Sequence, residues 1–305
     1  MQSKASSLSA TSRIANTNEA IVTYYDGTLI DYRWVMSTNR HFGLHFGYYD
    51  ERHSTCAAAC QNSNRTLAEK ARLRSGMRVL DAGCGIGGSS VWLAQHHEVY
   101  VTGVTLSLQQ CRAARELAQQ VDVADRTEFH VHDYLALPFA DRSFDIIWAL
   151  ESVCYTTDKA DFLREAMRVL RPGGRLVLAD GFRRDHRLPS HQERRLTKWL
   201  HCWAVPGFAV ISRFIDSLAA HGFVVLEQSE YTNHVLPFSR YLWTCSLFCL
   251  PAAIALRACG LLSHERWNNL IGAIIQYPSL KSRDWEYWIV VAEKPLSLPD
   301  RSRSD

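Results

Sequence analysis

The stretch Val79-Leu80-Asp81-Ala82-Gly83-Cys84-Gly85-Ile86-Gly87-Gly88 decides the fold of this chain. A short apolar strand runs into a glycine-rich turn, and an apolar helical pattern follows over residues 91–94. Glycines in such a turn permit positive φ angles and let the backbone approach a ligand closely. The stretch therefore predicts a nucleotide-like ligand that rests on the turn.

The residues around the turn discriminate between such ligands. A dinucleotide site places an acidic residue about 20 positions further on, where it binds a ribose hydroxyl. Here the second strand, 99–104, ends at Thr105 instead. Asp81 opens the turn, where its carboxylate would repel a pyrophosphate but suit an ammonium group. S-adenosylmethionine carries an ammonium and a sulfonium and no phosphate, so it fits this turn better than NAD.

Motifs over residues 76–180 resemble the class I S-adenosylmethionine-dependent methyltransferases. Residues 79–88 resemble motif I of that family. Residues 101–107, followed by Gln110, resemble the branch that holds the sterol, tocopherol, prenyl diphosphate and cyclopropane-fatty-acid enzymes, in which Thr replaces the usual acid. The segments 132–139, 144–147 and 170–176 also fit, the last as the turn before strand five.

The order of the expected elements indicates an α/β fold. Strands near 77–81, 99–104, 127–131, 144–149 and 175–180 alternate with helices, which predicts a parallel, doubly wound Rossmann-like methyltransferase sheet. A helix near 208–221, a strand at 224–226 and a last strand at 285–291 follow. The predicted divisions are a disordered N-terminus (1–18), an N-terminal helical cap (19–75), the cofactor-binding core (76–232), an inserted apolar helical lid (233–283), the last core strand (284–295) and a disordered tail (296–305).

The insertion is unusually apolar over 241–250 and again over 252–256. The run is shorter than the roughly 20 residues that a membrane span needs, and Pro251 interrupts it. We therefore expect a helical lid over an apolar pocket, as tocopherol-type methyltransferases have an apolar insertion in this place. The alternative is a surface helix that touches a membrane.

Charge and cysteine usage limit the other function classes. The formal net charge is +3, which implies no strong polyanion partner, and no basic stripe interleaved with stacking aromatics predicts nucleic-acid binding. The nine cysteines lack zinc-like spacing with histidines, so no metal site is expected. No secretory signal opens the chain, and we expect reduced thiols and a cytoplasmic location.

The resemblance assigns most of a cofactor site. The turn residues from Asp81 to Gly87 would cradle the methionine part, Thr105 and Gln110 would meet the ribose, and Asp133 would accept from the adenine amino group. Tyr25 is expected to close over the cofactor, with ordinary helix packing as the alternative. The predicted cofactor site comprises Tyr25, Asp81, Gly83, Gly85, Gly87, Thr105, Leu106, Gln110, Asp133 and Tyr134.

Glu151 is the main catalytic candidate. It follows strand four at the carboxyl end, where open α/β sheets bind ligands, and related C-methyltransferases carry a Glu in the matching position. A carboxylate there could stabilise a carbocation and then accept its proton. The alternative is that Glu151 caps the following helix. Tyr155 and His186 are candidates for assistance, and the predicted substrate-binding residues are Tyr48, Trp199, Trp203 and Trp243.

A basic cluster follows strand five: Arg183, Arg184, Arg187, Arg194, Arg195 and Lys198. These side chains could clamp a diphosphate, since Arg suits bidentate phosphate recognition, and Mg²⁺ would be needed only in that case. A solvated or membrane-facing helix surface is the alternative.

These features predict methyl transfer from S-adenosylmethionine to a carbon of a small lipophilic isoprenoid, a terpenoid or prenyl diphosphate, through a carbocation. Such a reaction belongs to terpenoid biosynthesis in secondary metabolism. The alternative is ring-carbon, N- or O-methylation of a tocopherol-like, quinol-like or alkaloid acceptor. A peripheral membrane contact is compatible with either reaction, and the oligomeric state stays open.

Overall fold

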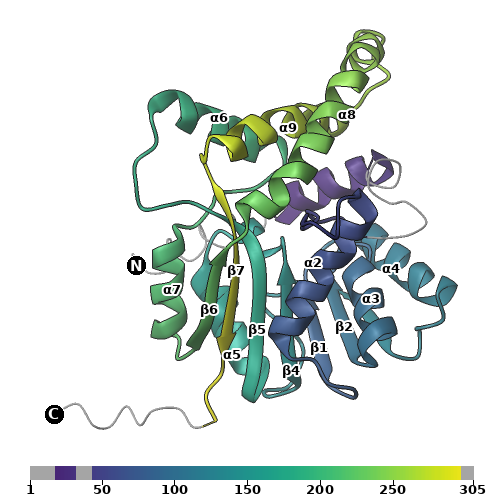
Figure 1. The fold of residues 1–305 in the computed structure, drawn as a ribbon. Helices are drawn as coiled ribbons and strands as arrows, with labels where there is room; N and C mark the ends of the chain where they lie inside the picture. Colours follow the sequence, from purple (N-terminus) through teal and green to yellow (C-terminus); the bar gives the residue numbers. More distant parts are fainter. Residues whose placement is uncertain (1–17, 32–42, 297–305) are drawn as a thin grey trace, which may run out of the picture.

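Seven strands form one central sheet in the order β3-β2-β1-β4-β5-β7-β6 (Figure 1). The computed structural model describes residues 18–31 and 43–296. The expectations of disorder at the two chain ends fall on residues 1–17 and 297–305, which lie outside the described residues. The strands are β1 (Arg78–Ala82), β2 (Tyr100–Thr105), β3 (Thr127–Val131), β4 (Phe144–Leu150), β5 (Leu170–Phe182), β6 (Val224–Glu230) and β7 (Glu286–Glu293).

The sheet is mixed. Strands β1 to β5 are parallel, which confirms the predicted doubly wound core, whereas β7 is antiparallel to both of its neighbours, β5 and β6. The register between β4 and β5 shifts between Phe144 and Ile146, so residues 171–174 form an irregularity at the start of β5. The sequence predicts a turn at these residues. Because β7 runs in reverse, its first residues lie at the same edge as the ends of β4 and β5.

Helices cover both faces of the sheet. One face packs against α2 (Cys56–Ala71), α3 (Gly88–His97) and α4 (Leu108–Gln120), and the other against α5 (Lys159–Val169) and α7 (Ile211–Ala220) (Figure 1). Neighbouring residues of β1 alternate between the two layers: Val79 joins the first core and Leu80 the second. A strand buried on both faces explains the nearly continuous apolar runs in the sequence.

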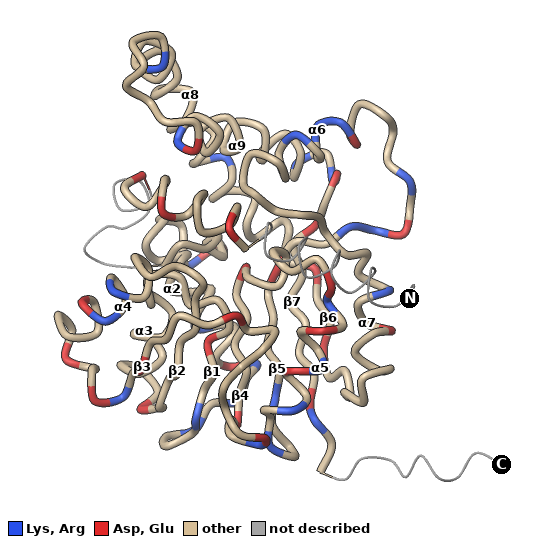
Figure 2. The backbone as a smooth tube through the Cα atoms, turned by 180° about the vertical axis from the view of Figure 1, so that it is seen from behind, with Lys and Arg blue, Asp and Glu red and all other residues tan. Residues whose placement is uncertain are grey.

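The remaining helices stand at the carboxyl edge of the parallel strands. They are the helix 18–31, the short η1 (Val153–Tyr155), α6 (Ser190–Cys202), α8 (Thr232–Ala258) and α9 (His264–Lys281). Helices α8 and α9 pack against each other, α6 packs on α9, and the far end of the α8–α9 hairpin projects beyond the body (Figure 1). Lys, Arg, Asp and Glu are spread over the body but are sparse along α8 (Figure 2).

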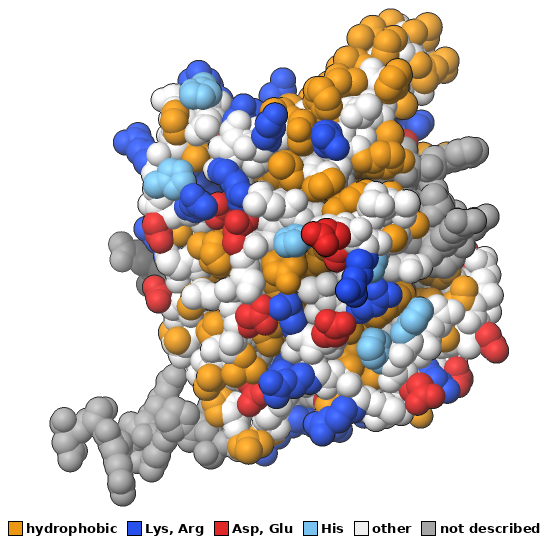
Figure 3. All heavy atoms as spheres, in the orientation of Figure 1, with side chains coloured by type: hydrophobic (Ala, Val, Ile, Leu, Met, Phe, Trp, Pro, Cys, Tyr) orange, Lys and Arg blue, Asp and Glu red, His pale blue; other side chains and the backbone are white. Residues whose placement is uncertain are grey.

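Helix α8 is continuous through Pro237 and Pro251, so the prediction that Pro251 interrupts the apolar run is wrong. Pro251 is exposed, and water can satisfy the carbonyl that its missing N–H leaves unpaired. Among the described residues, α8 alone is long and apolar enough to cross a membrane by length and composition, and 17% of its most apolar stretch is buried. Hydrophobic side chains cover the projecting end (Figure 3).

Candidate active site

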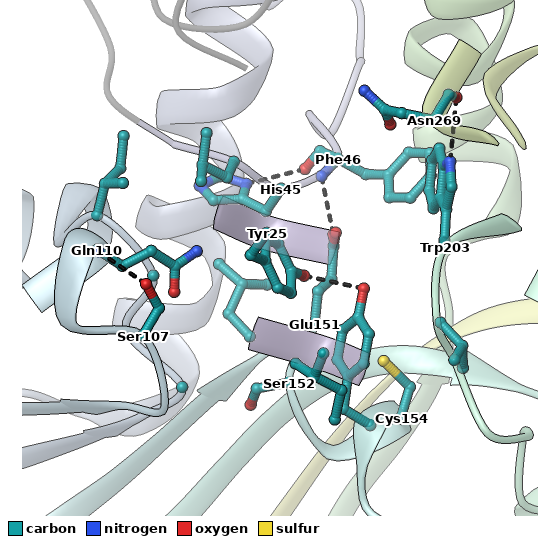
Figure 4. A pocket seen from close by; sticks show the side chains of 18 of the residues that line it. Tyr25, His45, Phe46, Ser107, Gln110, Glu151, Ser152, Cys154, Trp203 and Asn269 are labelled. Carbon is teal, nitrogen blue, oxygen red and sulfur yellow. Dashed lines mark hydrogen bonds between the residues drawn. The ribbon is translucent and has the colours of Figure 1, made fainter. Parts of the chain in front are cut away.

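A cavity of about 500 Å³ lies at the carboxyl edge of the parallel strands. Its floor comes from the carboxyl ends of the five parallel strands, β1 to β5, and from the residues that follow them. Its roof comes from the helix 18–31 and from α8 and α9. This is the edge where open α/β sheets bind ligands. Figure 4 shows Ser107 and Gln110 on one side of the cavity, Trp203 and Asn269 on the other, and Glu151 between them.

The glycine turn after β1 forms part of the floor. Gly83 has a φ of +96°, and a Cβ there would lie 2.4 Å from the Cβ of Ser152. Gly85 has a φ of +54° and faces open space, because a Cβ added there would have its nearest heavy atom, on Leu44, 3.8 Å away. Both glycines line the cavity, so the turn brings bare backbone up to the space that a ligand would fill.

Asp81 is a buried carboxylate beside this turn. It is 3% exposed, lines the cavity and accepts a hydrogen bond of 2.6 Å from the Ser90 hydroxyl. Burial raises the pKa of Asp81 to about 7, against the smaller lowering effect of the Ser90 hydrogen bond. A buried carboxylate is suited to a cationic ligand group, because a nearby ammonium stabilises the ionised carboxylate that burial disfavours.

The predicted ribose and adenine contacts gather on the β2–β3 side. The Thr105 hydroxyl donates to Gln110 Oε1 at 2.7 Å, which orients both side chains at the start of α4. The Asp133 carboxylate accepts from the Asn18 side-chain amide at 2.8 Å and from the Leu135 backbone N–H at 2.9 Å. Asp133 thus already accepts from an NH₂ group, the donor type that adenine carries. Leu106 and Tyr134 also line the cavity.

The helix 18–31 closes the cavity from above. Asn18, Ile21, Val22 and Tyr25 recur at helical spacing and line it. The Tyr25 hydroxyl donates to the Tyr155 hydroxyl at 2.9 Å, so the two candidate residues meet across the cavity. The helix also contacts α9 through Tyr24, whose hydroxyl donates to Asn269 Oδ1 at 2.9 Å.

These groups fit S-adenosylmethionine. The glycine turn offers exposed backbone, Asp81 suits the ammonium, Thr105 and Gln110 offer polar groups for a ribose, and Asp133 suits an exocyclic amine. The assignment of single residues to cofactor atoms stays a prediction.

Glu151 lies in the middle of the cavity in an unusual backbone conformation. Its φ is +53°, a left-handed value that few non-glycine residues adopt. Its Oε1 accepts from the Phe46 backbone N–H at 2.8 Å and from the Tyr287 hydroxyl at 2.7 Å (Figure 4 shows the Phe46 bond). Glu151 therefore faces the cavity and does not cap the following helix; its backbone N–H donates to Ala179 O at 2.8 Å.

The surroundings of Glu151 are low in polarity. Burial raises the pKa of the Glu151 carboxyl to about 8; the hydrogen bonds from Tyr287 and Phe46 act in the opposite direction, and the buried Asp180 adds to the rise. A carboxyl with a pKa near the working pH is suited to general acid–base chemistry.

Aromatic rings form one wall of the cavity next to Glu151. Trp199 stacks on Trp285 with ring centroids 4.7 Å apart and an interplanar angle of 12°, and Phe208 lies 5.4 Å from both rings. Phe46 lies 5.6 Å from Phe238 of α8 and 6.1 Å from Trp285. This wall gives an apolar acceptor a large surface, and aromatic faces also stabilise positive charge.

Four predicted residues do not line the cavity. Gly87 is the N-cap of α3; its neighbours in the chain, Ile86 and Gly88, line the cavity instead. Tyr48 is 1% exposed and lies behind Tyr287, with the two hydroxyls 3.4 Å apart. Trp243 packs on Tyr277, 5.4 Å away, on the side of α8 that turns from the cavity. His186 is exposed in the loop between β5 and α6, so the structure gives it no place beside Glu151.

Sequence reasoning missed Tyr287 and Trp285, which precede or begin β7 and reach the cavity. The sequence predicts the last strand but not its direction, and only an antiparallel β7 starts at the ligand edge. Phe46 lies two residues before the candidate Tyr48, in the predicted N-terminal cap. It contacts Glu151 through its backbone N–H, which a pattern of side chains cannot predict.

The basic cluster does not enter the cavity. None of its six side chains lines it, and three form ion pairs: Arg183 with Glu193 at 2.6 Å, Arg195 with Asp284 at 2.6 Å, and Arg184 with Glu286. A diphosphate clamp made from this cluster is therefore not present in the structure. Arg266, the one Lys or Arg among the described lining residues, pairs with Asp31 at 2.7 Å.

Comparisons with known proteins agree with this geometry. A family described as "Methyltransferase domain" matches residues 80–178. The chain is 44% identical over 170 residues to the 2-methyl-6-phytyl-1,4-hydroquinone methyltransferase of Synechocystis sp., a match that covers 54% of this chain and 52% of that protein. The chain thus spans about half the length of several curated relatives that it matches.

A second relative is covered more fully. The chain is 38% identical over 159 residues to the O-methyltransferase rstn1 of Aspergillus nomiae, which covers 51% of this chain and 71% of that protein. The cyclopropane synthase MmaA2 of Mycobacterium tuberculosis superposes with a TM-score of 0.78 over 91% of this chain and 98% of that one, at 18% identity, which supports the fold alone. The cavity and these relatives together show that the chain belongs to the class I S-adenosylmethionine-dependent methyltransferases.

Proposed function

We propose that the protein transfers a methyl group from S-adenosylmethionine to a carbon of a neutral, lipophilic isoprenoid acceptor through a carbocation. The observation that carries this proposal is Glu151, held with a left-handed backbone in the cavity and flanked by an aromatic wall. When bound, the cofactor supplies an electrophilic methyl group on sulfur.

The chemistry that these residues support can be written with its electrons. The π pair of an acceptor double bond forms the new C–C bond to the methyl group, while the electrons of the C–S bond remain on sulfur. One acceptor carbon is left with a positive charge, next to a mainly apolar lining. The Glu151 carboxylate and the ring faces of Trp199 and Trp285 stabilise this charge, and Glu151 then accepts a proton from an adjacent carbon.

The charge of the lining supports a neutral acceptor. The acceptor end carries mainly Trp, Phe, Leu and Ala side chains, and Arg266 is already paired with Asp31. A prenyl diphosphate, which would need cationic partners, is therefore the less favoured form of the acceptor.

An acceptor panel tests the proposal. Purified protein and labelled S-adenosylmethionine are incubated with neutral terpenes and prenyl alcohols, with geranyl and farnesyl diphosphates with and without Mg²⁺, and with tocopherols and quinols. We expect turnover with a neutral isoprenoid and a new C–methyl group in the product. Methylation of an oxygen or nitrogen alone would contradict the proposal, and turnover confined to diphosphates would contradict the neutral acceptor.

A second candidate function is methylation of a phenolic ring carbon or hydroxyl on a quinol-like acceptor. The specific observation that favours it is the 44% identity to a hydroquinone methyltransferase. The same aromatic wall would hold such a ring. In this reaction Glu151 would act as the base for a phenol, and the acceptor panel separates the two functions by the atom that gains the methyl group.

A further inference from the structure

The projecting end of the α8–α9 hairpin is an exposed apolar surface that the active site does not account for. We define it as the distal hairpin, residues 247–262. Phe248 is 84% exposed and Leu261 is 71% exposed, and Ile254 and Leu256 are also exposed. Figure 3 shows hydrophobic side chains covering this end of the molecule, whereas the body carries mixed charges. Exposed apolar surface of this extent marks a place of interaction.

The exposed apolar surface covers most of the circumference of the helix and is wider than a single stripe. Between Leu247 and Leu256, all residues except Leu250 and Ala253 are exposed, and none is charged. Consecutive residues of an α-helix are separated by about 100°, so the exposed side chains cover every side of this stretch except the one that carries Leu250 and Ala253. A protein partner would cover one face, whereas fluid hydrocarbon can surround the helix end. A helix that is apolar all round belongs in a protein core or a bilayer.

Two arginines of α8, Arg240 and Arg257, stand on either side of the exposed apolar stretch 247–256. The start of α9 adds no net positive charge, because Glu265 precedes Arg266 and Arg266 pairs with Asp31. Arg257 folds its guanidinium over the ring of Trp267, 4.4 Å from the centroid. A basic and aromatic border around an apolar end is typical of helices that insert at an anionic lipid surface, where the stem of an Arg lets its head group reach the phosphates.

The dimensions of α8 favour insertion into one leaflet over a span. Val235, Phe238 and Leu242, in the first half of α8, are buried against the body. The remaining segment, from Leu247 to Ala258, is about 18 Å long at 1.5 Å per residue, against about 30 Å for the hydrocarbon core of a bilayer. After this segment the chain turns back into α9.

We propose that the distal hairpin inserts into one leaflet of an anionic lipid bilayer and docks the enzyme on the membrane surface. The cavity lining continues to Cys249, Ala252 and Leu256, which are themselves exposed. A lipophilic acceptor can therefore pass from the bilayer along the hairpin into the cavity without crossing water. This entry route rests on the proposed function, whereas the docking itself does not.

Vesicle co-sedimentation tests the docking without any acceptor. Wild-type protein is mixed with vesicles of phosphatidylcholine, alone or with phosphatidylglycerol, and compared with the double variant Phe248→Asp/Leu261→Asp. The matched control is Val224→Asp, which places a charge at a 52% exposed apolar residue of β6, far from the hairpin. We expect wild type and control to pellet with the anionic vesicles, and the double variant to lose binding by about tenfold or more.

A fluorescent probe gives a second readout. Cys259 is an exposed thiol at the end of α8, and in a Cys249→Ser background it accepts an environment-sensitive label. Docking predicts a blue shift of the label with anionic vesicles and quenching by brominated acyl chains. Calorimetry with S-adenosylhomocysteine confirms that each variant is folded.

Three results would overturn the proposal. Wild-type protein could remain in the supernatant with both kinds of vesicle, or the double variant could bind as well as wild type. Sedimentation equilibrium without lipid could instead show a dimer that the double variant abolishes, with no vesicle binding; the distal hairpin would then be an interface between two copies of the chain. A failure of the acceptor panel leaves the vesicle result unaffected, so the two proposals fail separately.

Discussion

At the scale of single residues, Glu151 and Asp81 show how burial prepares a carboxylate for use. Each lies at the end of a parallel strand, where the chain leaves the sheet, and each faces the cavity. Burial raises the pKa of Asp81 to about 7 and that of Glu151 to about 8. A positive charge in the cavity lowers both values, so bound cofactor and the charge formed during reaction would each favour the ionised forms.

Glu151→Gln is expected to bind cofactor normally and to lose turnover by about 100-fold or more, because the amide keeps the shape but has neither charge nor basicity. Tyr287→Phe removes only the 2.7 Å hydrogen bond to Glu151 and should cause a smaller loss. It should also shift the rising limb of the kcat–pH profile to higher pH, because that bond favours the ionised carboxyl. Wild-type turnover in Glu151→Gln would remove Glu151 from the mechanism.

Asp81 makes a separate prediction about cofactor binding. Below about pH 7 the ligand-free site holds the proton of Asp81, and binding of an ammonium group must release it. The affinity for S-adenosylhomocysteine, measured by calorimetry, should therefore fall as the pH decreases below about 7. Asp81→Asn should bind about tenfold more weakly or worse at pH 8, with little pH dependence between about pH 5.5 and 7. An equal pH dependence in this variant would show that another group titrates.

At the scale of elements, the acceptor end of the cavity is built between α8 and α9. Ala253 of α8 and Ala273 of α9 are 8% and 9% exposed, and both line the cavity. Small side chains on facing helices leave the space that an acceptor needs. Both residues belong to the insertion, whereas the cofactor turn follows β1 in the floor of the cavity.

Ala253→Phe should fill the acceptor end, because the added ring has no other space next to α9. We expect the KM for the acceptor to rise by about tenfold or more while the dissociation constant for S-adenosylhomocysteine stays within about twofold. The control is Ala255→Phe, an exposed position on the same helix that does not line the cavity. Equal effects of the two substitutions would show that α8 does not bound the acceptor site.

The sequence predicted the elements whose formation depends on residues that are close together in the chain. The strands and the glycine turn follow from apolar runs and from backbone angles that only a few residues permit, and the structure confirms them. The continuation of α8 through Pro251 could not be predicted from the sequence. The free energy that a proline costs inside a helix depends on whether water can reach the carbonyl that loses its hydrogen bond. The hydrogen bonds that Tyr287 and the Phe46 N–H donate to Glu151 could not be predicted either, because they depend on the direction of β7 and on the path of a loop.

At the scale of the whole molecule, the cavity is assembled from segments far apart in the chain. The helix 18–31 reaches Asp133 through Asn18 and α9 through Tyr24, and so joins the core to the insertion. The groups that meet there include three carboxyls whose pKa burial raises: Asp81, Glu151 and Asp180. The Lys159 ammonium lowers the pKa of Asp180 without cancelling the effect of burial, and Arg266, the one Lys or Arg among the described lining residues, is paired with Asp31. In the ligand-free protein, folding and protonation are therefore coupled at this site.

This coupling predicts that the ligand-free protein becomes less stable as the pH rises. Between about pH 4.5 and 8 the folded state retains protons on Glu151 and Asp81 that the unfolded chain has released, so the folded state binds more protons and the free energy of unfolding falls with pH. His97, whose pKa burial lowers, acts in the opposite direction below about pH 6.5, so variants must be compared at matched pH.

We expect the Tm to fall from about pH 6.5 to 8.5 by at least about 2 °C more in wild type than in Asp81→Asn/Glu151→Gln. Saturating S-adenosylhomocysteine should reduce this difference, because its ammonium stabilises the ionised Asp81. Parallel Tm–pH curves for the two proteins, measured by calorimetry, would show that these carboxyls are ionised in the folded state throughout.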